Sequence, residues 1–169
     1  MRKISLVSIM LLVALVGSVN AQSSEKYQAL FIYNFTRYIE WPSANSSEFT
    51  IGVLGKSSVY NELITIAEGR KVGAQTIKVK KFASAAEINN CHIVFISSDA
   101  SSQIAALSSS APGKNTLIIT ERYGLISKGA GINFIEEDGK QKFQMSRSNL
   151  QKTGLKVNNQ LVSLATVVD

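Results

Sequence analysis

The sequence of 169 residues contains a single cysteine and a single histidine, which are adjacent as Cys91 and His92. With one cysteine no disulfide can form within the chain, so the fold must be stabilised by its core. A zinc site needs three or four ligands, and a hydrolase triad needs a histidine that can act as a base. Because both residues stand at the start of the most apolar predicted strand, we expect them to be buried. We therefore predict no metal, no cofactor and no enzymatic activity.

Long apolar segments are also scarce. The longest, residues 4–16, is shorter than the roughly 20 residues of a membrane-spanning helix, so no such helix is predicted. It follows two basic residues and precedes a small-x-small motif that ends at Ala21, which is the pattern of a secretory signal peptide. A lipid anchor would need a cysteine directly after this segment, and none stands there. We expect residues 1–21 to be a signal peptide and residues 22–169 to be one exported domain.

The chain has only a small excess of positive over negative charge. Lys and Arg number 18 against 12 Asp and Glu, and without Arg2 and Lys3 of the signal peptide the net charge falls from +6 to +4. The only basic cluster, Lys78, Lys80 and Lys81, alternates with apolar residues as the solvent face of a strand does. A nucleic-acid partner is therefore not expected.

The apolar segments alternate between helical and strand patterns. A first helix, capped at Ser23 or Ser24, is expected to bury one face made of Tyr27, Leu30, Phe31, Asn34, Phe35 and Tyr38. A second helix is expected near residues 58–67, with an apolar face of Val59, Leu63, Ile64 and Ile66 or Ala67. Further helices are expected near residues 84–88 and 101–109, and strands near residues 49–54, 76–82, 92–96 and 116–120. This alternation predicts an α/β fold: a layered sheet of mostly parallel β-α-β units flanked by helices.

The last third of the chain predicts a C-terminal β-hairpin over residues 131–145. Its centre, Asp138-Gly139, suits a two-residue type I′ turn. Pairing across this turn places Phe134 opposite Phe143 and Ile132 opposite Met145, so both strands show one apolar face in register. A short helix over residues 148–153 and a final segment over residues 155–168 are expected to follow.

Residues 52–57 have some features of a phosphate-binding loop, because Gly55-Lys56-Ser57 follows a strand and precedes a helix. The P-loop pattern needs a further glycine at position 50, which is Thr50 here. The pattern favours a strand that ends at Gly55 and a helix capped by serine.

Aromatic residues gather in the segment 31–43, which reads FIYNFTRYIEWPS. Most of them are expected to pack the first helix on the sheet, and Pro42 stops that helix. Arg37 and Glu40 are three residues apart and could form an ion pair. Trp and Arg together at a helix end are also typical of the residues that dominate binding energy in protein interfaces. The segment therefore predicts core packing with a recognition surface at its end.

Four motifs of the chain resemble those of the exported YfiR/HmsC-like proteins. They are F-T-R-Y-I-E-W-P at 35–42, C-H-I-V-F-I at 91–96, G-I-N-F at 131–134 and G-L-K-V-N-N-Q-L at 154–161. The resemblance implies a periplasmic, non-enzymatic regulator that binds and represses the extracytoplasmic part of an inner-membrane diguanylate cyclase, so that its loss raises cyclic di-GMP and favours biofilm. Some relatives dimerise, which makes a homodimer a further expectation.

Carried over residue by residue, the resemblance places the interaction site at Arg37, Tyr38, Glu40, Trp41 and Pro42. The chain departs from the family in two respects. Some relatives carry several cysteines linked to a redox response, whereas a single cysteine excludes a disulfide switch within the monomer. The usual F-x-I-N after the hairpin turn is here F-Q-M-S at 143–146.

Two other functions remain open from the residues alone. One is an envelope module that binds a small anionic ligand between Arg37 and the backbone N–H groups of residues 55–58, at the carboxyl ends of the strands. The other is an envelope adaptor without a signalling output.

Overall fold

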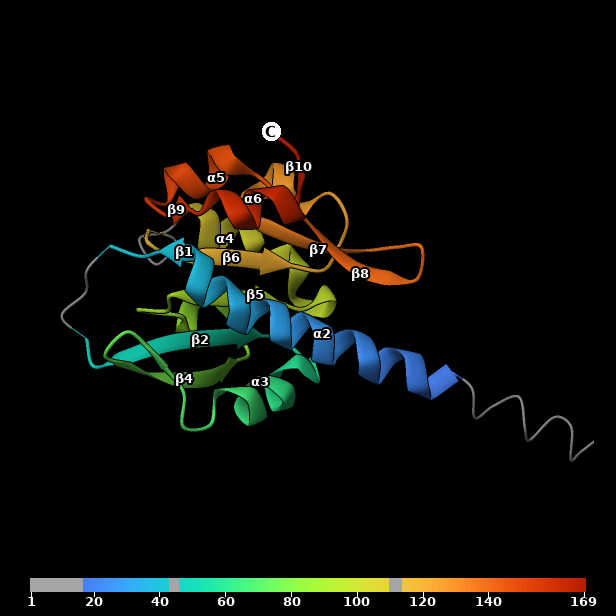
Figure 1. Cartoon of the computed structure of the whole chain (residues 1–169), viewed down its shortest axis with the longest axis horizontal. Helices are drawn as coiled ribbons and strands as arrows, with labels where there is room; N and C mark the ends of the chain where they lie inside the picture. The colour runs from blue at the N-terminus through green and yellow to red at the C-terminus, as the bar shows by residue number, and fades with distance from the viewer. Residues whose placement is uncertain (1–16, 43–45, 110–113) are drawn as a thin grey trace, which may run out of the picture.

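The computed structural model describes residues 17–42, 46–109 and 114–169. Within these residues an eight-stranded sheet lies between two layers of helices, which confirms the predicted α/β fold (Figure 1). Of the signal-peptide prediction, residues 1–16 lie outside the described part. Among the described helices, none is both long and apolar enough to cross a membrane.

Five strands form the parallel centre of the sheet, in the order β4-β2-β5-β6-β7. They are β2 (Glu48–Leu54), β4 (Gln75–Phe82), β5 (Ile93–Ile96), β6 (Leu117–Thr120) and β7 (Ile132–Glu137). The edges are extended by β3 (Lys71–Val72), antiparallel to β4, and by β8 (Lys140–Met145), antiparallel to β7, with β10 (Thr166–Val167) beyond it. A separate pair joins β1 (Ile39–Glu40) to β9 (Lys156–Val157).

The sheet separates two hydrophobic cores. All four residues of β5 are buried, and they alternate: Ile93 and Phe95 join one core, whereas Val94 and Ile96 join the other. The first core is covered by α2 (Gly17–Tyr38), α3 (Val59–Ala67) and α6 (Asn159–Leu164), with α5 (Arg147–Lys152) beside them. The second is covered by η1 (Ala85–Glu87), η2 (Ser98–Gln103), α4 (Ile104–Ser109) and η4 (Leu125–Lys128).

The predicted hairpin forms with the predicted register. Phe134 pairs with Phe143, and Ile132 with Met145. Asp138 and Gly139 have φ of 54° and 69°, the left-handed conformations that a type I′ turn requires. Phe35 of α2 packs against both phenylalanines of the hairpin, at ring-centroid distances of 6.2 Å and 5.2 Å. The basic cluster of β4 is exposed, as predicted.

The first helix differs from its prediction at its start and in its buried face. It begins at Gly17, so the two serines do not cap it, and Ser24 Oγ instead donates a hydrogen bond to Gln141 Oε1 at 2.9 Å. Tyr27 and Leu30 are 56% and 37% exposed, and Asn34 is also exposed, whereas Gln28, Ala29 and Ile32 are buried. The buried face is rotated because α2 contacts both the sheet and α3, and the apolar residues surround too much of the helix to define one face.

The face of α3 needs a smaller correction. Val59, Leu63 and Ala67 are buried as predicted, but Ile64 is 45% exposed. The helix starts on a hydrogen bond from the Val59 N–H to Ser57 Oγ at 3.2 Å, which agrees with the predicted serine cap.

Candidate functional site

The sequence predicts a site at the end of α2, which we call the α2 corner: Arg37, Tyr38, Glu40, Trp41 and Pro42. The structure divides it into packed and exposed members. Trp41 and Tyr38 are partly buried against the first core, whereas Arg37, Glu40 and Pro42 are exposed. Only the exposed members are available to a partner without rearrangement of the fold.

Trp41 holds the corner to the sheet. Its Nε1–H donates to the main-chain oxygen of His92 at 3.0 Å, and its ring meets that of Phe49 edge-on at 5.0 Å. Phe49 in turn stacks on His92, with ring centroids 4.3 Å apart. The carbonyl of Tyr38 accepts a hydrogen bond from Asn158 N–H at 2.9 Å. These contacts fix the end of α2 between β5 and β9.

Cys91 is buried, as predicted, whereas His92 is only partly buried. Burial raises the pKa of the Cys91 thiol to about 11. Burial also lowers the pKa of His92, whose Nδ1 accepts a hydrogen bond from the Thr50 N–H at 3.1 Å. No cluster of three or more His, Cys, Asp or Glu side chains suited to a metal occurs within the described ranges.

The exposed members of the corner carry unpaired charge. The predicted ion pair between Arg37 and Glu40 is not formed, and the side chain of Arg37 makes no hydrogen bond or ion pair with any described residue. Glu40 faces Lys156 across the β1–β9 pair, without an ion pair between them. The guanidinium of Arg37 is therefore free for another acceptor.

The alternative anionic site is not assembled. Lys56 N–H, at the carboxyl end of β2, already donates to the Asp99 carboxylate at 3.1 Å, and Ser97 Oγ donates to the same carboxylate. These hydrogen bonds lower the pKa of Asp99. Arg37 lies in the last turn of α2, which meets the amino ends of the parallel strands, because Trp41, four residues later, bonds His92 just before β5. The protein's own carboxylate thus fills the place that the sequence assigned to a ligand.

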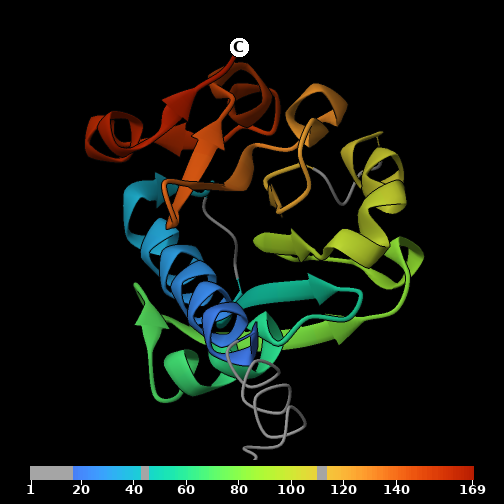
Figure 2. The ribbon, with the colours of Figure 1, turned by 90° about the vertical axis from the view of Figure 1, so that its right-hand side faces the viewer.

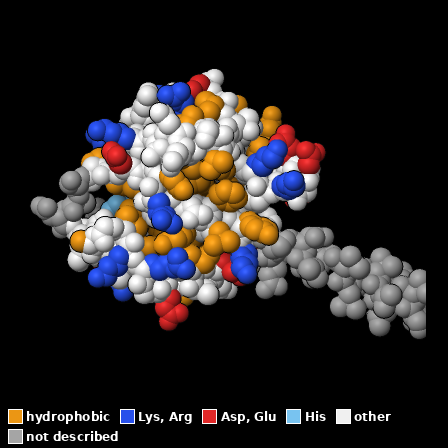
Figure 3. Space-filling model, viewed as in Figure 1, with side chains coloured by type: hydrophobic (Ala, Val, Ile, Leu, Met, Phe, Trp, Pro, Cys, Tyr) orange, Lys and Arg blue, Asp and Glu red, His pale blue; other side chains and the backbone are white. Residues whose placement is uncertain are grey.

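Apolar side chains gather on the outer side of α2. Figure 3 shows them along the middle of this face, with basic side chains above and below. Among the described residues, the large exposed ones on helices are Tyr27 and Leu30 of α2, Ile64 of α3 and Leu164 of α6. This surface lies on the same helix as Arg37.

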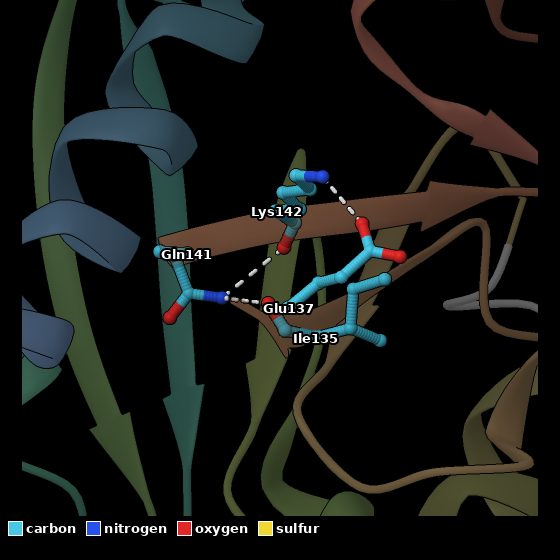
Figure 4. Close-up of polar contacts among 4 residues, drawn as sticks. All are labelled: Ile135, Glu137, Gln141 and Lys142. Atoms are coloured by element: carbon cyan, nitrogen blue, oxygen red, sulfur yellow. Dashed lines mark hydrogen bonds and ion pairs between the residues drawn. The ribbon is translucent and has the colours of Figure 1, made fainter. Parts of the chain in front are cut away.

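Away from the corner, α2 runs beside the hairpin of β7 and β8 (Figure 2). Two adjoining cavities lie there, between this part of α2 and the hairpin. The first has a volume of about 640 Å³ and the second about 420 Å³, and Ser24, Glu136 and Gln141 line both. Gln141 is held in place because its Nε2 donates to the carbonyls of Ile135 and Lys142, at 2.9 Å and 3.1 Å (Figure 4). An ion pair between Lys142 and Glu137 ties the two strands at the same point.

Sequence reasoning missed these cavities, although one signal pointed to them. Gln28 is a polar residue on the buried side of α2, and it reaches Glu121, which follows β6. A buried amide in an apolar helix face indicates a polar partner elsewhere in the fold. The position of that partner, 93 residues further along, does not follow from the sequence.

Comparison with known protein families identifies the family of the chain. A model described as YfiR/HmsC-like matches residues 25–166. The chain belongs to this family. The comparison with curated proteins found no match. The family is known as regulatory rather than catalytic, and membership suggests a periplasmic regulator of cyclic di-GMP signalling.

The family match spans both candidate sites. It includes the α2 corner as well as every residue that lines the cavities except Ser24. Membership of the YfiR/HmsC-like family thus supports the fold as a whole and selects neither end of α2 as the place of function.

Proposed function

We propose that the protein is a periplasmic, non-enzymatic regulator that binds the extracytoplasmic part of an inner-membrane signalling protein, of the diguanylate-cyclase type, and represses it. The observation that carries this proposal is the YfiR/HmsC-like match over residues 25–166. The pattern at the start of the sequence supports export, because a basic start, an apolar run and a small-x-small motif follow each other.

The contact surface in this proposal is the α2 corner. Arg37 and Glu40 are exposed and form no ion pair with a described residue, and Pro42 is exposed beside them. Tyr38 and Trp41 hold these residues on a rigid base through their contacts with β9 and β5. A rigid surface loses little conformational entropy on binding, and arginine is enriched among the residues that dominate interfaces.

The apolar side chains of α2 extend this surface. Leu30 is 37% exposed, one residue before the aromatic segment that leads to Arg37. An apolar centre with a charged rim is the usual anatomy of a protein interface. We therefore propose that the partner contacts the corner first and the outer side of α2 next to it.

The test is crosslinking of the tagged protein in its own envelope, followed by purification and mass spectrometry. The expected result is recovery of a membrane protein with a cytoplasmic cyclase domain, and a rise in cyclic di-GMP when the gene is deleted. Recovery of the protein alone, as a monomer or homodimer, with unchanged cyclic di-GMP would contradict the proposal. A version with Arg37→Ala, expressed at the same level, serves as the matched comparison.

A further inference from the structure

The smaller cavity lies where open α/β sheets bind ligands, at the carboxyl ends of parallel strands. Its lining includes Ser98 after β5, Glu121 after β6, and Ile135 and Glu136 at the end of β7. The chain forms β2, then β4 on one side of it, then β5 on the other, so the crevice expected from topology lies between β2 and β5. Asp99 fills that crevice, which leaves the space above β5, β6 and β7 as the open one.

Gln28 gives this cavity an unpartnered polar group. The side chain lines the cavity and is only 6% exposed, and its Oε1 is the one buried side-chain oxygen or nitrogen without a hydrogen bond in the described part of the chain. Its Nε2 faces Glu121 Oε2 at 3.4 Å, and this carboxylate fixes the orientation of the amide, because a flipped amide would set two acceptors together. An unpartnered buried acceptor destabilises the fold unless a donor reaches it.

The charges around the cavity favour a cationic donor. Glu121 is oriented by the Ser98 N–H at 2.8 Å and by Gln28, and Glu136 adds a second carboxylate. Among the residues that the structure describes, neither Lys nor Arg lines the 420 Å³ cavity, although the chain as a whole is basic; Lys140 lines only the larger one. The acceptors therefore outnumber the donors.

Aromatic side chains supply the apolar part of the site. Tyr27 and Phe31 line the adjoining cavity, and Tyr123, which is 86% exposed, stands at the smaller one. Aromatic faces attract ammonium groups as well as apolar groups. An amine with a short apolar body matches this combination, and the volume falls within the range of small-molecule sites.

We propose that the two adjoining cavities together bind a small organic amine, with its ammonium group in the smaller one against the carboxylates of Glu121 and Glu136, where a turn of the Gln28 amide brings Oε1 to it, and its apolar body in the larger one against Tyr27 and Phe31. The site lies at the other end of α2 from the corner that we assign to the protein partner. It stands whether or not the proposed repressor function holds. The ligand class is the opposite of the anion that the sequence suggested, because Asp99 occupies the anion-type position and carboxylates line the open one.

The test uses 2-phenylethylamine as the probe, in a titration of the ¹⁵N-labelled protein followed by NMR. The expected result is a saturable shift of the Gln28 side-chain amide and of the backbone amides of Ser98 and Glu121. The neutral analogue 2-phenylethanol and the anion phenylacetate should give no saturable shift at these positions. Absence of saturation with the amine, or equal binding of either analogue, would overturn the proposal.

Substitutions of residues that line the cavity test whether the amine binds there. Glu121→Gln keeps the shape of the side chain and removes its charge, and should weaken amine binding by at least about tenfold, because hydrogen bonds to charged groups are strong. Gln28→Met removes the buried acceptor and should also weaken it. Glu137→Gln, on the same hairpin but outside both cavities, should bind like the wild type. If Glu121→Gln does not fold, Gln28→Met decides, and unchanged affinity in either folded cavity variant would refute the site.

Discussion

Trp41 donates its indole N–H to the main-chain oxygen of His92, 51 residues further along the chain, at 3.0 Å. The His92 ring stacks on the Phe49 ring, and the Trp41 ring meets the Phe49 ring edge-on. One contact thus ties the end of the first helix to the start of the central strand β5. The tryptophan of the Trp-Pro motif is therefore part of the scaffold, whereas the side chain of Arg37 nearby is exposed.

Replacement of Trp41 by phenylalanine tests this division. Trp41→Phe keeps an aromatic ring against Phe49 but removes the indole donor to the His92 oxygen, which then accepts only from the Leu117 N–H. We expect the free energy of unfolding to fall by about 1–2 kcal/mol, the usual cost of one lost hydrogen bond with some lost packing. Urea denaturation followed by far-UV circular dichroism measures it. Tyr123→Phe, at an exposed position, is the control, and equal stability of both variants would mean that the contact contributes nothing.

Arg37→Ala should leave the stability of the fold almost unchanged and weaken the binding of the partner. The side chain is exposed and makes no hydrogen bond or ion pair with a described residue, so stability should change by less than about 0.5 kcal/mol. Affinity for the extracytoplasmic domain of the partner should fall at least about tenfold if Arg37 lies in the contact. Isothermal titration with the purified domain measures this.

Lys128→Ala is the matched control for Arg37→Ala. Lys128 is also an exposed basic residue, but it belongs to η4, which covers the second core on the other side of the sheet. Its loss should leave the affinity unchanged. Equal weakening by both substitutions would point to general charge attraction, and no weakening by Arg37→Ala would place the contact elsewhere.

His92 predicts how stability depends on pH. Burial lowers its pKa below the ordinary value of 6.5, and its Nδ1 accepts the Thr50 N–H, so the folded state keeps the ring neutral. As the pH falls, His92 is protonated in the unfolded chain before it is protonated in the folded protein. The free energy of unfolding should therefore be fully present above pH 6.5 and decrease below it. Urea denaturation at about pH 7.5 and about pH 5.5 measures the effect. Both pH values lie above the range in which most carboxylates titrate.

His92→Gln provides the comparison for this pH effect. Glutamine can accept the Thr50 N–H through its side-chain oxygen but does not titrate. Because the chain has no other histidine, the difference in stability between the two pH values should be smaller in the variant. The same pH dependence in both proteins would show that other groups cause it.

Cys91 should be nearly unreactive while the protein is folded. Burial raises its thiol pKa from 9.0 to about 11, and the side chain is only 4% exposed. The thiolate is the reactive form, and two pKa units lower its population about a hundredfold, so alkylation by iodoacetamide at pH 8 should be at least about a hundredfold slower than in urea. Mass spectrometry at timed intervals measures the rate. Rapid alkylation of the folded protein would show that β5 opens at this end.

The hairpin and the central strands follow from the sequence because local patterns determine them. Asp138-Gly139 selects the turn, the turn sets the register, and Phe134 then faces Phe143 without help from the rest of the fold. The continuous apolar run at 92–96 likewise predicted a strand covered on both faces, and all of β5 is buried.

The buried face of α2 and the two sites depend on contacts between distant segments. Apolar residues surround most of α2, so only the placement of the sheet and α3 decides that Ile32 is buried and Tyr27 exposed. The carboxylate of Asp99 occupies the Lys56 N–H from 43 residues away, which no local pattern reveals. Residues 37–42 could be selected from the sequence, but their division into packed and exposed members could not.

The buried amide of Gln28 gives the last prediction. In the absence of an amine its Oε1 has no hydrogen bond, and such a group usually costs about 1–3 kcal/mol. Gln28→Met has a similar length and no polar atom to bury, and its only lost contact is the long one to Glu121 at 3.4 Å. We therefore expect this variant to unfold at a higher urea concentration than the wild type while it loses amine binding. Binding sites often keep groups that lower stability in this way. A less stable Gln28→Met would instead show that the amide supports the fold, and the case for a ligand at this cavity would lose its strongest argument.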